Sequence, residues 1–426
     1  MPDRISPASR VSGEICLPGD KSISHRYAML ASIAEGESRI HNFSTGADCH
    51  STLGCMRVLG IRVDEQGADV TIYGGGLDGL KAPAADLDAG NSGSTIRMLS
   101  GILAAQPFTA RIGGDESLSR RPMERIMRPL GQMGASIAAR EGRFPPLEIR
   151  GAKLRAIDYT LPVPSAQVKS CVLFAGLYAD GATVVREPVR SRDHTEIALR
   201  EFGAEILVER RVITLAGRPR LTGRELFVPS DLSSAAFFIV AALLLPDSNL
   251  VLRGVGLNPT RSTLLDVLVS MGASIQILNV EQQNGELVGQ ILVKHSRIRG
   301  GVIEKDTTAA LIDEIPVLAV LGAASEEGLD VRDAGELRIK ETDRIATIAD
   351  NLRRMGIQAE VSPDGIRVPG RQRFHAAELD SFGDHRIAMA FSIAALVADG
   401  PCDIHGAEAA SVSFPEFYRL LRQVTA

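Results

Sequence analysis

The sequence predicts an α/β protein that is built from repeated strand–helix units and divided into two domains. Three observations lead to this prediction. A short phrase around a glycine recurs five times along the 426 residues, and six strongly apolar segments with helical character alternate with it. The chain is also too long for one ordinary hydrophobic core.

The recurring phrase consists of a large apolar residue, a glycine, a small or apolar residue and then an alternating run. Each copy follows a stretch with helical periodicity, such as 263–270 or 345–354. The glycine lies where a helix C-cap needs a left-handed residue, and the alternation after it is typical of a strand. We therefore expect a helix–glycine–strand junction at 59–63, 133–137, 202–206, 271–275 and 355–359.

The six apolar segments are rich in Ala, Leu and Ile and show little amphipathicity, as expected of helices buried on most sides. They are 24–34, 94–105, 165–179, 233–245, 315–324 and 385–397. Polar residues able to cap a helix precede each of them, within Asp20-Lys21-Ser22, Asn91-Ser92-Gly93, Pro164-Ser165, Ser230-Asp231, Asp313-Glu314 and Gly383-Asp384. Six βα units, three per domain, follow from this pattern, and Pro229-Ser230-Asp231 is the best boundary within the chain.

Composition excludes several classes of protein. Hydrophobic residues make up 45% and charged residues 23%, which is typical of a folded globular chain. A net charge of -5, 4% aromatic residues and no Trp argue against a nucleic-acid partner. No apolar run reaches the length of a membrane span, and residues 1–10 lack the apolar core of a signal peptide, so we expect a cytoplasmic location.

The five cysteines, Cys16, Cys49, Cys55, Cys171 and Cys402, have no paired spacing and leave one over. This pattern indicates free thiols in a reducing compartment. Cys49, His50 and Cys55 lie close in sequence, but two thiols and one imidazole lack a fourth ligand. We therefore expect no metal site.

Charged and small polar residues gather at the starts of the predicted buried helices. A helix N-terminus attracts anions, because its N–H groups are free and carry partial positive charge. Each motif alone is explained as a cap, a tight turn or a solvated charged face. Equivalent ends of repeated units tend to converge in space, however, so the groups at five of the six buried helices are expected to line one cavity: 20–26, 90–97, 164–170, 313–314 and 382–386. Further charged motifs lie at 117–123, 190–194 and 338–344.

Five positions within these motifs carry specific predictions. Lys169 in an apolar helix requires a partner, and Pro122 suits the first position of a helix. Lys340 and Arg344 are i,i+4 neighbours if their segment is helical. Asp313 is either an N-cap or, if it faces a substrate hydroxyl, a general base.

In their order and separation these motifs resemble the 5-enolpyruvylshikimate-3-phosphate synthase family, over essentially the whole chain. The segments that carry the resemblance are 20–26, 90–95, 119–123, 338–344 and 383–386, and 164–167 with 191–196 resemble its class II branch. The resemblance implies a two-domain inside-out α/β barrel of six βαβαββ repeats, three per domain, with the active site in the interdomain cleft. The implied domains are 1–18 plus 230–426 and 19–229.

The resemblance also implies an activity. The chain would transfer the enolpyruvyl group of phosphoenolpyruvate to the 5-hydroxyl of shikimate-3-phosphate and release phosphate, a transferase step of the shikimate pathway toward chorismate and the aromatic amino acids. No metal and no organic cofactor would be needed. A cytoplasmic monomer is implied, without nucleic-acid or membrane partners, and glyphosate would compete with the donor where there is room beside Gly93.

Family roles carry over by position. Asp313 matches the proton acceptor, and Glu341 matches a proton donor or relay that acts with Lys21. The positions matching the shikimate-3-phosphate site are Lys21, Ser22, Arg26, Ser165, Ala166 (through its backbone), Gln167, Ser191, Arg192, Asp313 and Lys340. Those matching the phosphoenolpyruvate site are Lys21, Gly93, Arg121, Gln167, Arg344 and Arg386, with Asn91 and His385 as further candidates.

Charge supports this assignment, because the two substrates together carry roughly five negative charges. The implied site supplies seven cations, which are Lys21, Arg26, Arg121, Arg192, Lys340, Arg344 and Arg386. Two positions depart from the family pattern. Val412 stands before Ser413-Phe414-Pro415, where many members have Lys, and Ser94 stands where Thr is commoner.

Two alternatives to this interpretation predict different residues. A related enolpyruvyl transferase that acts on UDP-N-acetylglucosamine usually carries a Cys in the loop that is 113–121 here, and the sequence has none between Cys55 and Cys171. A non-catalytic repeat scaffold that binds anions would not need Asp313, Glu341 and the full set of cations.

Overall fold

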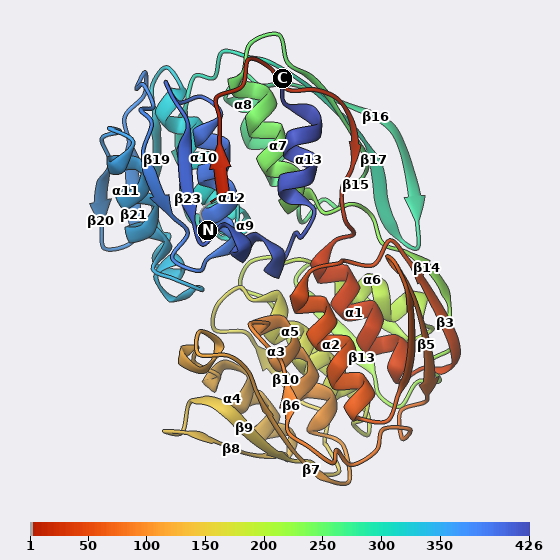
Figure 1. Ribbon diagram of the computed structural model, residues 1–426. Coiled ribbons are helices and arrows are strands. Elements are labelled where there is room, and N and C mark those ends of the chain that lie inside the picture. The colour runs from red at the N-terminus through yellow and green to blue at the C-terminus, as the bar shows by residue number, and fades with distance from the viewer. Residues whose placement is uncertain (1–2) are drawn as a thin grey trace. The chain divides into compact units, whose positions relative to one another are not determined.

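The computed structural model describes residues 3–426 (Figure 1). The chain divides into two compact units. Unit 1 contains the residues up to Pro18, Pro229–Gln282 and Leu287–Ala426, and unit 2 contains Gly19–Val228 and Gln283–Glu286. The chain therefore leaves unit 1 after Pro18 and returns to it at Pro229.

The three sheets of unit 2 share one plan, in which a parallel pair of strands is extended by antiparallel strands. Their orders are β14-β3-β5-β4, β6-β7-β9-β8 and β10-β11-β13-β12. The strands are β3 (Glu35–His41), β4 (Arg62–Gln66), β5 (Asp69–Gly75), β6 (Leu87–Asp88), β7 (Thr109–Gly113), β8 (Ser136–Arg140), β9 (Phe144–Arg150), β10 (Asp158–Thr160), β11 (Ala182–Arg186), β12 (Ile206–Glu209), β13 (Val212–Ala216) and β14 (Glu225–Phe227).

Unit 1 repeats the plan in the orders β16-β17-β15-β2, β18-β19-β21-β20 and β1-β23-β22. The N-terminal strands complete it, because β2 pairs parallel with β15 and β1 pairs antiparallel with β23. The strands are β1 (Asp3–Ile5), β2 (Ser12–Cys16), β15 (Asn249–Gly256), β16 (Ser274–Gln283), β17 (Glu286–Lys294), β18 (Gly301–Ile303), β19 (Leu329–Val331), β20 (Glu360–Ser362), β21 (Gly365–Val368), β22 (Glu378–Asp380) and β23 (Cys402–His405).

The six predicted apolar helices are all present and almost wholly buried, each in the hydrophobic core of its own unit. In unit 1, α7, α10 and α12 contact one another, and in unit 2, α3 packs against both α1 and α5. Their bounds are α1 (Lys21–Ser32), α3 (Gly93–Leu103), α5 (Ala166–Gly176), α7 (Leu232–Leu244), α10 (Ile315–Ala324) and α12 (His385–Ala395).

The five helix–glycine–strand junctions are confirmed. The glycines have positive φ angles of 86° (Gly60), 115° (Gly134), 96° (Gly203), 102° (Gly272) and 78° (Gly356). They follow α2 (Ala47–Val58), α4 (Glu124–Met133), α6 (His194–Glu201), α8 (Thr263–Ser270) and α11 (Arg344–Arg354), and precede β4, β8, β12, β16 and β20. The remaining helices are α9 (Lys305–Leu311), α13 (Phe417–Val424) and the 3₁₀ turns η1 (Leu118–Arg120), η2 (Gly335–Ile339) and η3 (Ala407–Val412).

Five of the six predicted helix caps are confirmed. The side chains of Asp20, Ser92, Ser165, Asp231 and Asp384 each accept a backbone N–H in the first turn. The prediction for α10 is wrong, because Glu314 holds the N-cap position and makes no side-chain cap bond. Asp313 lies one residue too early to cap this helix.

Two further local predictions are wrong. Pro122 is not the first residue of α4, since Met123 holds the N-cap position and the helix begins at Glu124. Lys340 and Arg344 do not share a helix, because η2 ends at Ile339, Lys340 follows it as an extended C-cap residue, and α11 begins at Arg344. The intervening residues form a bend, so the proximity of these two cations has a tertiary cause.

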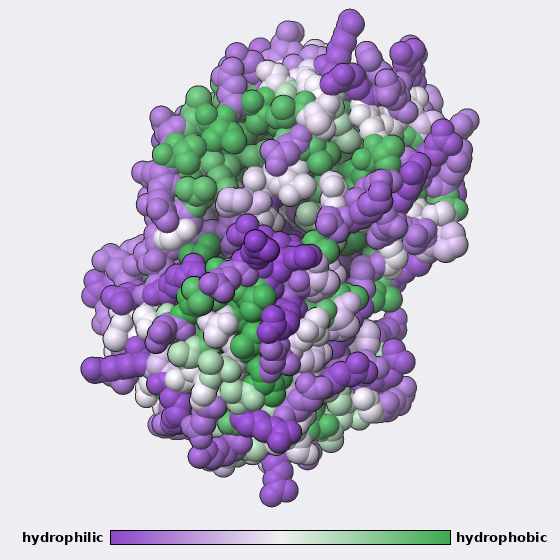
Figure 2. Space-filling view, turned by 180° about the vertical axis from the view of Figure 1, so that it is seen from behind, coloured by the Kyte–Doolittle hydropathy of each residue, from purple (hydrophilic) through white to green (hydrophobic). Residues whose placement is uncertain are grey.

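All five cysteines are free thiols, as predicted. No single helix within residues 3–426 is long and apolar enough to cross a membrane; α9 and α10 pass that test only as a pair bent by 110°. On the face in Figure 2, hydrophobic side chains appear in patches between hydrophilic ones. Large hydrophobic side chains exposed on unit 1 include Val269, Ile277, Leu278, Val280 and Leu287, on α8 and the β16–β17 hairpin.

Candidate active site

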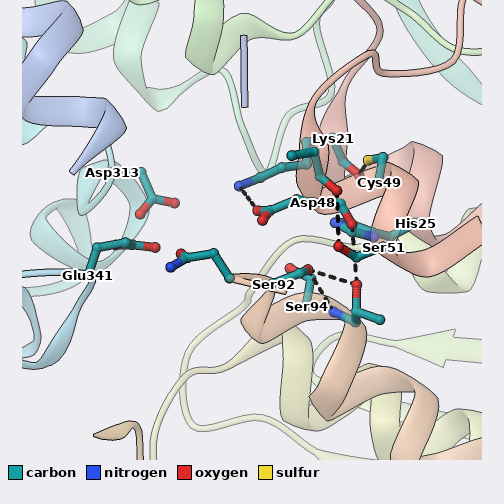
Figure 3. Close-up of polar contacts among 12 residues, drawn as sticks. Lys21, His25, Asp48, Cys49, Ser51, Ser92, Ser94, Asp313 and Glu341 are labelled. Carbon is teal, nitrogen blue, oxygen red and sulfur yellow. Dashed lines mark hydrogen bonds and ion pairs between the residues drawn. The ribbon is translucent and has the colours of Figure 1, made fainter. Parts of the chain in front are cut away.

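The start of α1 carries the first predicted cation. Asp20 caps the helix by accepting the backbone N–H of Ile23 at 2.9 Å, and Lys21 is its first residue. The Nζ of Lys21 lies 2.8 Å from the Oδ2 of Asp48, which is on α2 (Figure 3). The sequence analysis missed Asp48, because nothing in its local pattern distinguishes it from an ordinary acidic residue in the first turn of a helix.

Arg26, one turn further along α1, is buried among oxygen atoms. Its Nε donates to the Oγ1 of Thr195 at 2.6 Å, and its terminal nitrogens donate to the Oγ of Ser170 at 2.8 Å and the carbonyl of Ser22 at 2.7 Å. Burial lowers the pKa of Arg26 to about 10, although Glu196 opposes that shift. The guanidinium therefore holds the backbone of Ser22 in place, and its predicted direct contact with substrate stays a prediction.

The start of α3 brings together several predicted residues of the donor site. The guanidinium of Arg97 donates to the Oε1 of Gln167 at 2.7 Å, and the Nε2 of Gln167 donates to the Oγ of Ser94 at 2.9 Å. A methyl group built on Gly93 would lie 2.9 Å from Arg97 and 3.4 Å from Arg121. Two guanidinium groups thus lie directly against the Gly93 backbone.

Asn91 holds the second of these guanidinium groups. The Nη2 of Arg121 donates to the Oδ1 of Asn91 at 2.9 Å and to the Oγ of Ser117 at 3.2 Å. Gly93, Arg121 and Asn91 are therefore neighbours, in agreement with their grouping by the sequence. The sequence analysis did not assign Arg97, although a charged residue in an apolar helix was the same signal that singled out Lys169.

Lys169 has the buried partners that its position predicted. Its side chain is 0% exposed, and its Nζ lies 2.7 Å from Glu196 and 3.2 Å from Glu187. Burial raises the pKa of Glu196 even though Lys169 opposes that shift. The backbone N–H and the hydroxyl of Ser191 both donate to Glu187. Lys169 therefore fixes the segment that carries Ser191 and the half-buried Arg192.

Ser165 and Ala166 open α5 in the same unit. Ser165 caps the helix through the backbone N–H of Val168 at 3.3 Å, and Ala166 is the first helical residue. The Ser165 hydroxyl thus already accepts one hydrogen bond and keeps its own proton for a ligand.

In unit 1 the two predicted carboxylates lie beside cations. The Oδ1 of Asp313 lies 3.1 Å from the Nζ of Lys340 and 3.5 Å from a terminal nitrogen of Arg344. The other terminal nitrogen of Arg344 lies 2.6 Å from the Oε2 of Glu341. In Figure 3 the side chains of Asp313 and Glu341 lie beside one another. Arg344 thus contacts both predicted acid–base residues, and Lys340 contacts Asp313.

Arg344 is the fixed point of this cluster, with a side chain only 2% exposed. Its Nε donates to the Oδ2 of Asp384 at 2.8 Å. Burial alone lowers the pKa of Arg344, but Asp384, Glu341 and Asp313 raise it above its usual value. Arg344 therefore stays charged and orients both acid–base candidates.

The start of α12 carries the last predicted cation. A terminal nitrogen of Arg386 donates to the Oγ of Ser233 at 2.7 Å and lies 3.7 Å from Glu314. The hydroxyl of Ser233 donates to Glu314, and the neighbouring His385 is buried. Val412, which stands where a lysine is common in the family, ends η3 and leaves this part of unit 1 without that cation.

Within residues 3–426 no three His, Cys, Asp or Glu side chains are grouped so as to hold a metal ion. Cys49 is buried, and its thiol faces the carbonyl of Lys21 at 3.6 Å. Burial raises the pKa of this thiol well above its usual value.

The repeated α/β units, each with a buried helix, place the chain in a known class of two-unit α/β folds. The same fold occurs in the enolpyruvyl transferase NikO from Streptomyces tendae, with a TM-score of 0.79 over 99% of this chain and 96% of that chain. Sequence identity is only 20%, so this likeness shows the fold alone.

A sequence model of the EPSP synthase (3-phosphoshikimate 1-carboxyvinyltransferase) family matches residues 5–421, and the chain belongs to this family. A 3-phosphoshikimate 1-carboxyvinyltransferase from Solibacter usitatus is 72% identical over 424 residues, which cover both proteins completely. One from Koribacter versatilis is 54% identical over 421 residues, covering 99% of this chain and 98% of that protein. EPSP synthase from Acinetobacter baumannii has a TM-score of 0.87 at 42% identity, covering 99% and 98% of the two chains.

These relatives confirm the predicted family, the transferase class and the α/β fold, and they favour the main interpretation over both alternatives. The roles of individual residues stay predictions.

Proposed function

We propose that the chain transfers the enolpyruvyl group of phosphoenolpyruvate to the 5-hydroxyl of shikimate-3-phosphate and releases inorganic phosphate. The observation that carries the proposal is the position of Asp313 and its contacts with two cations. Its carboxylate lies just before a buried helix without capping it, and Lys340 and Arg344 both contact its Oδ1. Such a carboxylate is suited to accept a proton, and the relatives' names identify the substrate class.

The proposed acceptor contacts are direct for most residues and indirect for one. Because the Arg26 guanidinium donates to Ser22, Ser170 and Thr195, we propose that it orients Ser22. The residues proposed to contact shikimate-3-phosphate are Lys21, Ser22, Ser165, Ala166, Gln167, Ser191, Arg192, Asp313 and Lys340.

The proposed donor contacts centre on the Gly93 turn. Small residues there let the carboxylate and phosphate of phosphoenolpyruvate approach the backbone, and guanidinium groups bind such oxygens in pairs. Arg97 joins this proposal because it lies beside Gly93 and holds Gln167. The residues proposed for the donor are Lys21, Gly93, Arg97, Arg121, Gln167, Arg344 and Arg386.

The first half of the reaction is an addition. The 5-hydroxyl oxygen bonds to C2 of phosphoenolpyruvate while its proton passes to Asp313. C3 takes a proton from Glu341 or Lys21, so the methylene becomes a methyl group and a tetrahedral intermediate forms. In the second half the C2–O bond to phosphate breaks, and phosphate leaves with the proton that Asp313 took up. The C3 methyl group returns a proton to the side chain that supplied it, which restores the double bond and leaves both side chains as they began.

The side chains proposed here are sufficient for both steps of this reaction. Seven cations face roughly five substrate charges, so they stabilise bound phosphate and its departure. Both proton transfers have a partner, and neither half requires an electron acceptor or a Lewis acid. The proposal includes a cytoplasmic monomer without a metal, an organic cofactor or a macromolecular partner.

Product mass tests the proposal. The chain is incubated with phosphoenolpyruvate and either shikimate-3-phosphate or UDP-N-acetylglucosamine. We expect a product only with shikimate-3-phosphate, with the summed mass of both substrates less phosphoric acid. An adduct with the nucleotide sugar alone would favour the related transferase, and no adduct with either would favour the anion-binding scaffold.

A further inference from the structure

A chain of buried hydrogen bonds connects α1, α2 and α3 beneath the Gly93 turn. The Nδ1 of His25 lies 2.7 Å from the Oγ1 of Thr52, which lies 2.7 Å from the Oγ1 of Thr95. Thr95 in turn donates to the Oγ of Ser92 at 2.8 Å. All four side chains are 0% exposed, and Figure 3 shows the two ends, His25 and Ser92. Membership of the EPSP synthase family does not by itself assign a role to these hydroxyl groups.

The His25 ring sets the direction of this chain. Burial lowers the pKa of His25 well below its usual value, and the charges of Lys21 and Arg26 add to that effect, so the ring is neutral. Its Nε2 is buried and has no hydrogen-bond partner among the described residues. A buried N–H without a partner is rarer than a buried acceptor without one. The proton therefore belongs on Nδ1, which donates to Thr52.

Because each hydroxyl group has only one proton to donate, the direction of every other hydrogen bond in the chain follows. Thr52 accepts from His25 and must donate to Thr95, and Thr95 must donate to Ser92. Ser92 also accepts the backbone N–H of Thr95 at 3.0 Å, which is the N-cap bond of α3. Its oxygen thus receives two hydrogen bonds from one residue, and these hold the turn that precedes Gly93 in a single orientation.

We propose that His25 and Thr52 are positioning residues of the donor site, which orient the Ser92–Gly93 turn through this directed hydroxyl chain. The inference rests on the proposed function for the identity of the ligand. A turn fixed in this way keeps the Gly93 backbone against Arg97 and Arg121, within 3.4 Å of a methyl group built there. Thr95 also lies 3.4 Å from the carbonyl of Asp48, but its one proton is used in the shorter bond to Ser92 at 2.8 Å.

The first test is spectroscopic and needs no turnover. Nitrogen-15 chemical shifts of His25 in the full-length protein distinguish a protonated Nδ1 from a protonated Nε2. We expect the Nδ1–H form in the wild type, and a changed Nδ1 shift in Thr52→Val, where the acceptor is gone. A wild-type ring protonated on Nε2 would reverse the chain and overturn the proposal.

The second test is kinetic. Thr52→Val keeps shape and removes the hydroxyl, Thr52→Ser restores it, and Thr183→Val is the matched control. Thr183 is buried in β11, and its hydroxyl has no partner among the described residues. We expect Thr52→Val to raise the KM for phosphoenolpyruvate about five- to tenfold, which corresponds to the loss of one buried hydrogen bond. The kcat and the KM for shikimate-3-phosphate should stay within about twofold of the wild-type values.

Thr52→Ser should recover most of the donor KM, and Thr183→Val should match the wild type. The positioning role would be overturned if Thr52→Val lowered only the melting temperature and had the same KM for phosphoenolpyruvate as Thr183→Val. If the wild type shows no turnover with these substrates, the proposed function fails, and the His25 tautomer still decides the direction of the hydroxyl chain.

Discussion

Replacement of Asp313 by Asn separates the chemical role of this residue from a structural one. Asparagine keeps the shape of the side chain but cannot accept the proton of the 5-hydroxyl. A positioned general base contributes about 10²- to 10⁴-fold, so kcat should fall by at least about 10²-fold. The KM for shikimate-3-phosphate should change far less, because the other proposed contacts remain.

The structure also limits the effect on stability. Asp313 caps no helix, since Glu314 holds the N-cap position of α10. Its pair with Lys340 is partly exposed, with side-chain exposures of 19% and 29%, and such pairs contribute about 1 kcal/mol or less. Arg344 keeps its bonds to Asp384 and Glu341. The melting temperature should therefore shift by no more than about 4 °C.

The assay is phosphate release at saturating concentrations of both substrates, with thermal unfolding measured on the same preparations. Asp330→Asn is the matched control, because Asp330 is a partly exposed carboxylate of unit 1 paired with Arg332 at 2.7 Å. This control should retain wild-type kcat. If Asp313→Asn retained kcat within about threefold, or lost activity only in proportion to unfolded protein, the general-base role would be refuted.

Three further predictions follow from other parts of the structure. Gly93→Ala should weaken inhibition by glyphosate more than it raises the KM for phosphoenolpyruvate, because the added methyl group would meet the longer inhibitor while the shorter substrate still fits. Inhibition curves and donor KM values for the two proteins test this, and equal weakening of both ligands would contradict it. Lys169→Met should destabilise unit 2 by about 3 to 5 kcal/mol in urea titrations, because it leaves the buried carboxylates of Glu187 and Glu196 without their cation, and it should also raise the KM for shikimate-3-phosphate. The control Lys153→Met, at an exposed ion pair, should cost less than about 1 kcal/mol. The lowered pKa of His25 means that the unfolded chain takes up a proton below about pH 6.5 while the folded chain does not, so stability is lost as pH falls, by up to about 1.4 kcal/mol per unit. His25→Gln should flatten this slope between pH 7 and pH 5, and parallel slopes would show that the ring titrates in the folded protein.

The features that the sequence predicted well are those with local causes. Gly60 and its four counterparts each follow a helix, and a left-handed residue at a helix end is decided within one turn. Lys169 was predicted to need a partner because a charge inside an apolar helix cannot remain unpaired. The partners themselves, Glu187 and Glu196, come from the segment after β11 and could not be identified by spacing.

The predictions that failed depended on where a helix begins. Asp313 was taken as a candidate cap, but α10 starts two residues later. Lys340 and Arg344 were placed on one helical face, yet a bend separates η2 from α11, and both cations still reach Asp313. Pro122 failed for the same reason at the start of α4.

Asp48 and Thr52 escaped the sequence analysis because their partners are distant in the chain. Asp48 meets Lys21 across 27 residues, and Thr52 meets Thr95 across 43 residues. Both lie on α2, a helix whose polar residues the sequence analysis did not single out. Only packing against α1 and α3 reveals that this helix supports the candidate site.

The most direct test of the central claim is a phosphorus NMR time course with the purified chain, phosphoenolpyruvate and shikimate-3-phosphate. The account predicts that the phosphoenolpyruvate signal is replaced, one for one, by inorganic phosphate, while the phosphate ester of the acceptor moves to a product signal and is not released. Omitting the acceptor should leave phosphoenolpyruvate unchanged. Phosphate release without the acceptor, release from the acceptor ester, or an unchanged spectrum with both substrates would contradict the account.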